Sequence, residues 1–287
     1  MRVTALMYKK SAFLMGFFVF ILFFGFAGAK ELPFPNSCYE IIGETKYLKE
    51  PKEVLFVLID ESAGFDENIV ERVVTLVTSW LDEGKAIEVF RFSSFSKDRY
   101  TEKVIGGLAD PAPTDEFLDN IKRSERLKFD QCHKKQLLLA KNQVRKAMLG
   151  IFSGSSTEIG HSDIVANLKT VSGHIKRSDA KLKKVLIVSD MLENSSITSF
   201  YASGQVRQID PDQELAKVEK AGFMGDFYGA EVYIFGLGYF ARSELSKKES
   251  YLDPKRLSLI KDFWANYIKK SNGKVAEIGT PTLLGNL

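Results

Sequence analysis

Three polar segments of the chain carry residues that could hold a metal ion. One follows the apolar run VLFVLI at residues 54–59, one follows VLIV at 185–188, and the third is the Ser/Thr loop 153–157 between them. Carboxylate and hydroxyl oxygens are hard ligands, which suit Mg²⁺, Mn²⁺ or Ca²⁺ rather than zinc. The candidate metal ligands are Asp60, Ser62, Thr157 and Asp190.

Each of these residues also has a plain structural interpretation. Asp60 and Ser62 suit the cap of the following helix, and Asp190 suits the start of a turn. What favours a site is the combination, because similar side chains follow two separate apolar runs. Whether these side chains form one site therefore depends on where the surrounding elements place them.

The elements around these residues alternate between strand and helix. Apolar, β-branched runs predict strands at 54–59, 87–92, 104–105, 185–188, 231–235 and 274–278. Apolar stripes at helical spacing predict helices at 66–82, 115–123, 131–152, 162–175 and 212–222, with a last helix from 253. This alternation predicts an α/β doubly wound fold, a mostly parallel sheet with helices on both faces. In such sheets ligands bind outside the carboxyl ends of the strands.

Several local signals set the expected element boundaries. Asp66 and Ser162 are predicted helix N-caps, and Asp253-Pro254 places a cap and a first-turn proline at the start of the last helix. Gly106-Gly107 predicts a turn after a short edge strand. The segment 194–210 shows no periodicity and is expected to be irregular.

Three of these segments together resemble the von Willebrand factor type A domain. They are VLFVLIDESAG at 54–64, STEIG at 156–160 before a helix, and VLIVSD at 185–190. The strand 87–92 followed by Ser93 also fits the family, and the resemblance covers roughly residues 52–280. It implies a doubly wound sheet with a metal-ion-dependent adhesion site at its upper edge.

The resemblance assigns that site residue by residue. The family's Asp-x-Ser-x-Ser motif matches Asp60 and Ser62, its middle-loop threonine matches Thr157, and its later aspartate matches Asp190. Gly64 stands where the family has its second serine, so one hydroxyl ligand is missing. Glu61, Glu193 or a water molecule could fill the gap, and weak Mg²⁺ binding is still compatible with the pattern.

The resemblance implies a binding module rather than an enzyme. In the family, an acidic side chain of a partner protein completes the coordination of the metal. The segment 193–210 beside the site could then supply partner contacts. Phe223, Phe227 and Tyr228 could add apolar contact area, or could simply pack beneath a loop.

Charge gives no reason to expect a nucleic acid as a partner. Forty basic and 37 acidic residues leave a formal charge of +3, and the excess lies in residues 1–29, which contain three basic residues and no acidic one. The remainder of the chain is balanced, and a basic patch on a nucleic-acid scale is not predicted from its composition.

The first 29 residues have the pattern of an export signal. Basic residues at positions 2, 9 and 10 precede the uncharged apolar run 11–26, and Ala27-Gly28-Ala29 offers a cleavage site before Lys30. We expect residues 30–51 to form an N-terminal tail and residues 52–287 a single domain, periplasmic or extracellular. The alternative is an uncleaved signal, with residues 11–26 as an inner-membrane anchor, the one membrane contact expected.

Export changes the interpretation of the two cysteines. In an oxidising compartment Cys38 and Cys132 are expected to form a disulfide that ties the tail to a helix about halfway along the chain. The alternative is a thiol nucleophile at Cys132 assisted by His133. Adjacent residues of a helix point in different directions, which argues against that pair.

Enzyme functions have weaker support in the sequence. A haloacid-dehalogenase-like phosphatase needs a second aspartate where Ser62 stands. A serine hydrolase could combine Ser62, His161 and Asp190, but Gly-x-Ser-x-Gly is absent around Ser62. Gly236-x-Gly238 is too short a motif to predict nucleotide binding. The stronger alternative is a metal-free structural subunit of an envelope, secretion or conjugation machine.

Overall fold

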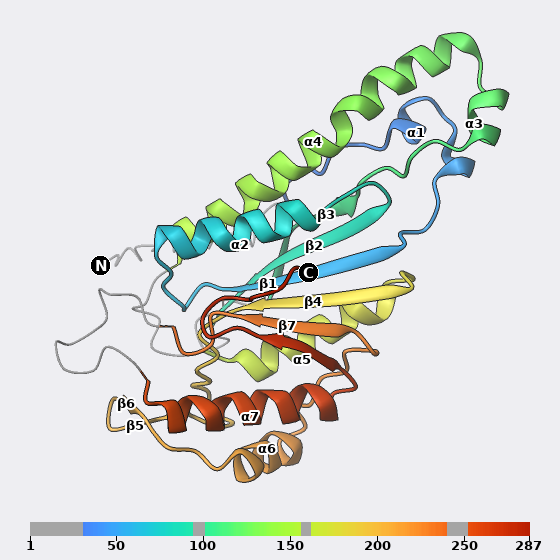
Figure 1. The fold of residues 1–287 in the computed structure, drawn as a ribbon. Helices are drawn as coiled ribbons and strands as arrows, with labels where there is room; N and C mark the ends of the chain where they lie inside the picture. The colour runs from blue at the N-terminus through green and yellow to red at the C-terminus, as the bar shows by residue number, and fades with distance from the viewer. Residues whose placement is uncertain (1–30, 94–100, 156–161, 240–251) are drawn as a thin grey trace, which may run out of the picture. The chain divides into compact units, whose positions relative to one another are not determined.

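A six-stranded sheet forms the centre of the molecule (Figure 1). The computed structural model describes residues 31–93, 101–155, 162–239 and 252–287. The strand order is β3-β2-β1-β4-β7-β8, and only β3 runs antiparallel to its neighbour. The strands are β1 (Glu53–Asp60), β2 (Lys85–Phe92), β3 (Glu102–Leu108), β4 (Leu182–Val188), β7 (Glu231–Phe235) and β8 (Lys274–Ile278). The predicted α/β doubly wound fold is confirmed.

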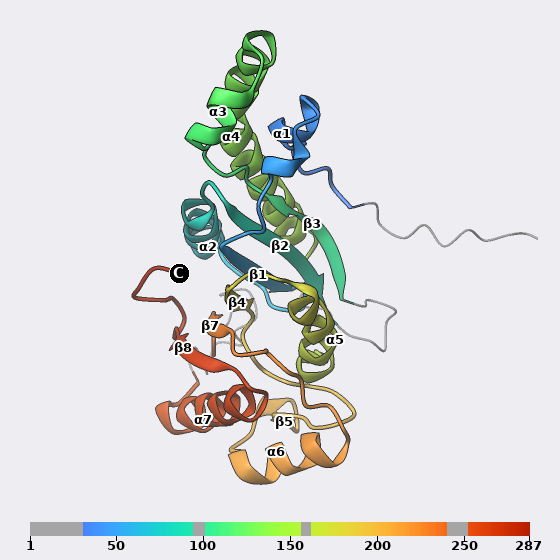
Figure 2. The same ribbon diagram turned by 90° about the vertical axis from the view of Figure 1, so that its right-hand side faces the viewer.

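Helices cover both faces of this sheet (Figures 1 and 2). One face packs against α2 (Glu67–Trp80) and α4 (Arg123–Gly154), and the other against α5 (Ile164–Arg177), α6 (Pro211–Lys220) and α7 (Pro254–Lys270). The shorter elements are α1 (Cys38–Ile41), η1 (Thr45–Tyr47), α3 (Asp115–Asn120), β5 (Tyr201–Ala202) and β6 (Gln205–Val206).

The central strand β1 is apolar throughout because both of its faces are buried. Leu55, Val57 and Ile59 pack with α2 and α4, whereas Phe56 and Leu58 pack on the opposite face with α5 and α7. Full burial of such a side chain stabilises the fold by about 1.5–3 kcal/mol. This packing fixes the direction of β1 and delivers its last residue, Asp60, to the carboxyl edge of the sheet.

The edge strand β3 is longer than predicted and includes both glycines that were expected to form a turn. Gly106 and Gly107 pair with Glu88 and Ile87 of β2. The ring of Phe34 lies so close to Gly107 that a β-carbon there would be 2.3 Å from it. Gly107 therefore serves close packing against the N-terminal tail, a role that residue type alone does not distinguish from a turn.

Helix α4 begins at Arg123 rather than at 131, and α3 ends at Asn120. The first turns of α4 carry few apolar residues, so an apolar stripe does not mark them. Their inward residue, Phe129, is fully buried against Tyr39 and Phe117, with ring centroids 4.8 Å apart in both pairs. This small aromatic cluster lies apart from the two main cores and supports the early part of α4.

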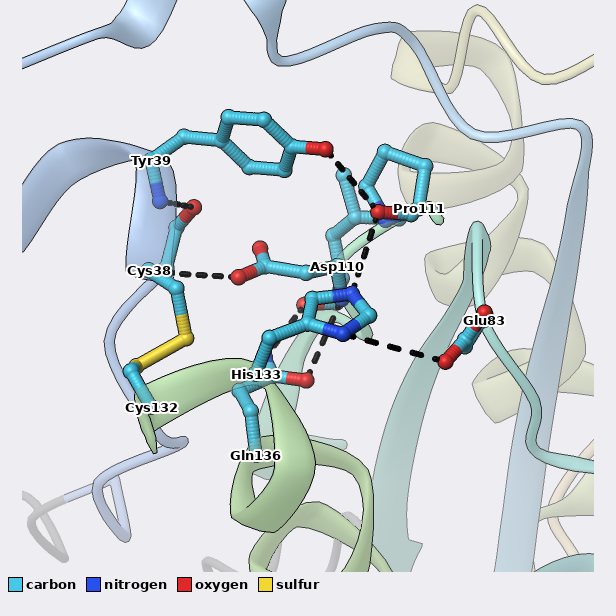
Figure 3. The surroundings of a disulfide bond; sticks show 10 residues. Cys38, Tyr39, Glu83, Asp110, Pro111, Cys132, His133 and Gln136 are labelled. Carbon is cyan, nitrogen blue, oxygen red and sulfur yellow. Dashed lines mark hydrogen bonds and ion pairs between the residues drawn. A yellow bond between two sulfur atoms is a disulfide. The ribbon is translucent and has the colours of Figure 1, made fainter. Parts of the chain in front are cut away.

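The predicted disulfide joins Cys38 of α1 to Cys132 of α4 (Figure 3). Beside it, the backbone N–H of Cys38 donates to Asp110 Oδ2 at 2.6 Å, and the Tyr39 hydroxyl donates to the Pro111 carbonyl at 3.1 Å. A ring nitrogen of His133 lies 3.2 Å from the same carbonyl. Because both cysteine sulfurs are bonded, the alternative of a thiol nucleophile at Cys132 is wrong.

The described part of the N-terminal tail is attached to the sheet as well as to α4. The N–H of Leu32 donates to the Val104 carbonyl of β3 at 2.7 Å. The predicted signal at 1–29 lies outside the described residues, so cleavage and the domain boundaries drawn from it remain predictions. Within the described ranges, the helices are all too short or too polar to cross a bilayer.

Candidate functional site

The ends of β1 and β4 meet at one edge of the sheet. The two strands are parallel neighbours, and Ile59 lies opposite Val188 in their register. Asp60 and Ser189 therefore leave the sheet side by side, as the spacing of the motifs predicted. Thr157, the remaining candidate ligand from the Ser/Thr loop, lies outside the described residues.

Asp60 is fully buried and accepts four hydrogen bonds. Its Oδ1 accepts from the Ser62 N–H at 2.9 Å and from the Ser62 hydroxyl at 2.5 Å. Its Oδ2 accepts from the Ser189 hydroxyl at 2.7 Å and from the Ser162 hydroxyl at 3.1 Å. We call these four residues, Asp60, Ser62, Ser162 and Ser189, the Asp60 cluster.

The Asp60 carboxylate has no acceptor position left in this arrangement. A carboxylate offers about four lone-pair directions, and all four are used here. Burial raises the pKa of Asp60 above its ordinary value, and the hydrogen bonds from Ser62, Ser189 and Ser162 act against that rise. Asp60 is therefore best placed to orient three hydroxyl groups rather than to bind a cation directly.

Ser162 has a different role from the one predicted. The N-cap of α5 is Asp163, not Ser162. Ser162 instead pairs with Asn194 through two backbone hydrogen bonds, which brings its hydroxyl to Asp60. Sequence spacing did not reveal the contact between Ser162 and Asp60, because these two residues are 102 positions apart. Ser189 was not predicted as a site residue either, although its place directly after β4 is a signal for this edge.

The second predicted carboxylate, Asp190, lies at the same edge and is partly exposed. Its Oδ1 accepts from the Leu192 N–H at 2.9 Å, and its carbonyl accepts from the Gly238 N–H at 2.9 Å. The first bond closes the turn after β4, and the second holds that turn against the turn after β7. Asp190 and Ser62 are thus the partly exposed members of the predicted set that the structure brings to this edge.

The three accessory candidates differ in surroundings. Glu61 is buried, and its Oε1 lies 3.6 Å from Nη1 of Arg91. Glu193 is fully buried, and its Oε2 accepts from the N–H of Val165 in the first turn of α5 at 3.0 Å. Gly64 is partly exposed in the loop between β1 and α2. Their roles as substitute ligands remain predictions.

Aromatic side chains that were not predicted as site residues lie beside this edge. Phe65 stacks on Tyr239 with ring centroids 5.5 Å apart and meets Phe152 edge-on at 6.2 Å. All three are partly exposed, and the Tyr239 hydroxyl donates to Asp66 at 2.6 Å. Their sequence signal is weak, because single aromatic residues in loops and at helix ends usually serve packing.

Gly236 has a steric role at the same edge rather than a part in nucleotide binding. Its φ is +106°, and a β-carbon there would lie 2.8 Å from both the Phe65 ring and the Ser189 carbonyl. Only glycine suits this backbone conformation and this close approach. Gly236 therefore allows the ends of β4 and β7 and the Phe65 ring to pack together.

The expected partner segment 193–210 is held firmly to the body of the protein. Its β5–β6 hairpin covers Phe200, which is fully buried, and Arg207 forms a 2.8 Å ion pair with Glu214 of α6. Phe227 is 1% exposed and packs in the core, in agreement with the packing interpretation, while Tyr228 is 37% exposed.

The described histidines do not support a serine hydrolase at Ser62. His133 contacts the Pro111 carbonyl near the disulfide, and Nδ1 of His174 lies 3.3 Å from Glu88 of β2. His161 lies outside the described residues. The Ser62 hydroxyl donates its hydrogen bond to the Asp60 carboxylate, so its proton points to a carboxylate rather than to an imidazole.

The oxygen atoms at this edge fit a hard cation only through their hydroxyl groups. Because the protons of Ser62 and Ser162 point to Asp60, the free lone pairs of these hydroxyl oxygens are available to an ion. A carboxylate cage does not fit, since in the described ranges no three His, Cys, Asp or Glu side chains gather closely enough to hold a metal. Any cation would rest on hydroxyl oxygens, water and Asp190.

The hydrogen bonds of Asp60 lead to a stability prediction. In Asp60→Asn, one side-chain oxygen becomes an NH₂ donor, so two of the four donors around it lose their acceptor. We expect a loss of about 2–3 kcal/mol in the free energy of unfolding, measured by urea denaturation. The matched change Asp262→Asn, at an exposed residue of α7, should have almost no effect. Equal stabilities of the two variants would contradict this account of the cluster.

Comparisons with known proteins do not assign a family. No protein-family model matches this chain, and no curated protein matches it. An aerotolerance-related membrane protein from Bacteroides fragilis, with multiple mutations to serine, aligns with a TM-score of 0.34 and 8% identity over 79% of this chain and 92% of that chain. A conserved hypothetical protein BatB from Bacteroides thetaiotaomicron aligns with a TM-score of 0.39 and 12% identity over 78% and 89%. Similarities this low carry no functional argument.

Proposed function

We propose that this chain is an exported protein-binding module of the von Willebrand factor A type, which engages its partner at the carboxyl edge of the sheet. The observation that carries the proposal is the Asp60 cluster, in which a buried carboxylate orients three hydroxyls beside the partly exposed Asp190. The Phe65–Tyr239 stack adds aromatic contact area, which protein interfaces favour. The module works in the periplasm or outside the cell and performs no catalytic step.

A divalent cation is part of this proposal. Ser62, Ser162 and Asp190 would contribute to holding Mg²⁺, Mn²⁺ or Ca²⁺, with Asp60 behind them as the hydrogen-bond acceptor. The cation would supply an electrophilic contact for an acidic side chain of the partner. Gly64 removes one hydroxyl from the family's pattern, so the expected affinity is low.

All acceptor positions of the Asp60 carboxylate are taken by hydrogen bonds, which favours a second candidate function. In it, the chain is a metal-free structural subunit that binds its partner through the same edge. Thermal unfolding separates the two. Millimolar Mg²⁺, Mn²⁺ or Ca²⁺ is expected to raise the melting temperature of the wild type relative to EDTA, by about 2–4 °C for each kcal/mol of binding energy. Asp190→Asn is expected to remove this shift, whereas Asp226→Asn, at a residue in the loop before β7, should retain it. Identical melting with and without cation would reject the metal-bound version.

The binding function needs its own test. Capture of a partner from the native envelope should weaken in Asp190→Asn and not in Asp226→Asn, and should weaken in EDTA if the cation takes part. Capture that is unaffected by Asp190→Asn would place the binding surface elsewhere on the molecule.

A further inference from the structure

Helix α4 carries a concentration of positive charge, although basic and acidic residues are equal in number over residues 30–287 as a whole. Residues 123–154 contain eight basic residues and two acidic ones. In the described part of the chain, only Arg145 of these eight forms an ion pair, with Glu71 of α2 at 2.8 Å. The unpaired basic residues are Arg123, Arg126, Lys128, Lys134, Lys135, Lys141 and Lys146.

The outward side of α4 also exposes leucines in a straight line. Leu127, Leu138 and Leu149 are 62%, 63% and 37% exposed, and Leu139, which is 49% exposed, lies about 100° around the helix from Leu138. The first three are spaced by 11 residues, which is about three helical turns, so they lie one above another along the helix. Leu149 is nine residues from the buried Ala140, which is about two and a half turns at about 100° per residue. The two side chains therefore lie on opposite sides of the helix. We call Leu127, Leu138 and Leu149 the leucine line.

Lysines flank the leucine line on both sides. At about 100° per residue, Lys134 and Lys141 lie to one side of it, and Lys128, Lys135 and Lys146 lie to the other. Lysine side chains can lay their methylene stems along an apolar surface and keep the ammonium group in a polar layer. A narrow apolar line between two rows of lysines fits the surface of an anionic bilayer, where negatively charged headgroups cover an apolar interior.

We propose that the outward face of α4 docks on a bilayer surface that contains anionic lipids. The line spans about 33 Å, so a helix lying parallel to the bilayer would reach it with all three leucines. A partner helix fits less well, because pairing of helices needs two apolar residues in every seven, and here the leucines are about 16 Å apart. This membrane contact is additional to the one expected through residues 11–26.

The test uses the chain from Lys30 onwards, which retains the whole compact unit Glu31–Leu287 and lacks the apolar run 11–26. It is sedimented with vesicles of phosphatidylcholine plus phosphatidylglycerol, and with vesicles of phosphatidylcholine alone. Binding is expected only to the anionic vesicles and should weaken as salt increases. Binding that ignores phosphatidylglycerol, or no binding to either vesicle, would overturn the proposal.

Paired variants assign the binding to α4. Lys134→Gln with Lys135→Gln is expected to weaken vesicle binding about thirtyfold, since each lysine near an anionic surface contributes about a factor of five. The control is Lys255→Gln with Lys261→Gln, which changes the net charge equally at exposed positions of α7. Leu138→Ala should also weaken binding, unlike Leu284→Ala at a 98% exposed leucine. Equal effects of the two lysine pairs, or a salt-sensitive complex with an acidic protein in place of vesicle binding, would refute the lipid assignment.

Discussion

Replacing Cys38 and Cys132 by serine is expected to lower the free energy of unfolding by about 4–5 kcal/mol. The two cysteines are 94 residues apart, and the chain-entropy account assigns this much to a cross-link that closes so long a loop. Urea denaturation of the double variant against the oxidised wild type measures the difference. After loss of the disulfide, α1 is still held by the hydrogen bonds to Asp110 and Pro111 and by the packing of Tyr39 against Phe117 and Phe129.

A reductant provides the control for this prediction. Dithiothreitol should lower the stability of the wild type to that of the double variant and leave the double variant unchanged. A loss below about 1 kcal/mol would mean that the unfolded chain gains little freedom when the cross-link is removed. The aromatic packing of Tyr39 against Phe117 and Phe129 would then be what holds α1 on α4.

The disulfide and the sheet could be predicted from the sequence because their signals are local or depend on compartment. The runs at 54–59 and 185–188 are apolar at every position, which is typical of strands buried on both faces. They form the centre of β1 and the C-terminal half of β4. Once β1 and β4 are parallel neighbours, the meeting of Asp60 and Ser189 follows from the direction of the chain.

The members of the Asp60 cluster could be predicted only in part. Ser189 directly follows β4, and Ser62 lies two residues after the end of β1, so the sequence indicates the edge at which they lie. Ser162 reaches Asp60 through its pairing with Asn194, a contact between two loops that no periodicity encodes. Ser162 instead resembled a helix cap, because serine before an apolar stripe is the usual signal of one.

The predicted element boundaries were wrong where tertiary contacts, rather than local sequence signals, determine the structure. Gly107 lies in a strand because the Phe34 ring occupies the space of a side chain, and the first turns of α4 are helical because Phe129 packs with Tyr39. In both cases the stabilising partner comes from the N-terminal tail, far away in the sequence. A pattern read along α4 or β3 alone does not contain that information.

The second large effect is expected from the pH dependence of stability, through Glu193. The side chain is fully buried, and burial raises its pKa to about 8 from the ordinary value of 4.5. The hydrogen bond from the Val165 backbone N–H opposes the rise, and the charge of nearby Asp163 adds to it. The folded state binds this proton more tightly than the unfolded state. The contribution of protonated Glu193 to the free energy of unfolding is therefore complete below about pH 4.5 and is lost as the pH rises through about 8.

The size of this effect follows from the shift. At about 1.36 kcal/mol per pH unit, ionisation of Glu193 is expected to lower the free energy of unfolding by about 4–5 kcal/mol between acidic and alkaline conditions. Glu193→Gln is neutral at every pH and should abolish this part of the dependence. The variant is expected to be about as stable as the wild type near pH 5 and more stable by several kcal/mol near pH 9.

The difference between wild type and variant isolates Glu193 from other titrating groups, among them Asp60, whose pKa is also raised by burial. Urea denaturation across this pH range gives both curves, and Glu67→Gln, at an exposed residue in the first turn of α2, is the control. If the free energies of unfolding of the wild type and Glu193→Gln differed by the same amount at every pH, Glu193 would not be protonated in the folded state. In the expected case, alkaline pH places a charge between the first turn of α5 and the Ser162–Asn194 pairing, so the Asp60 cluster should loosen with it.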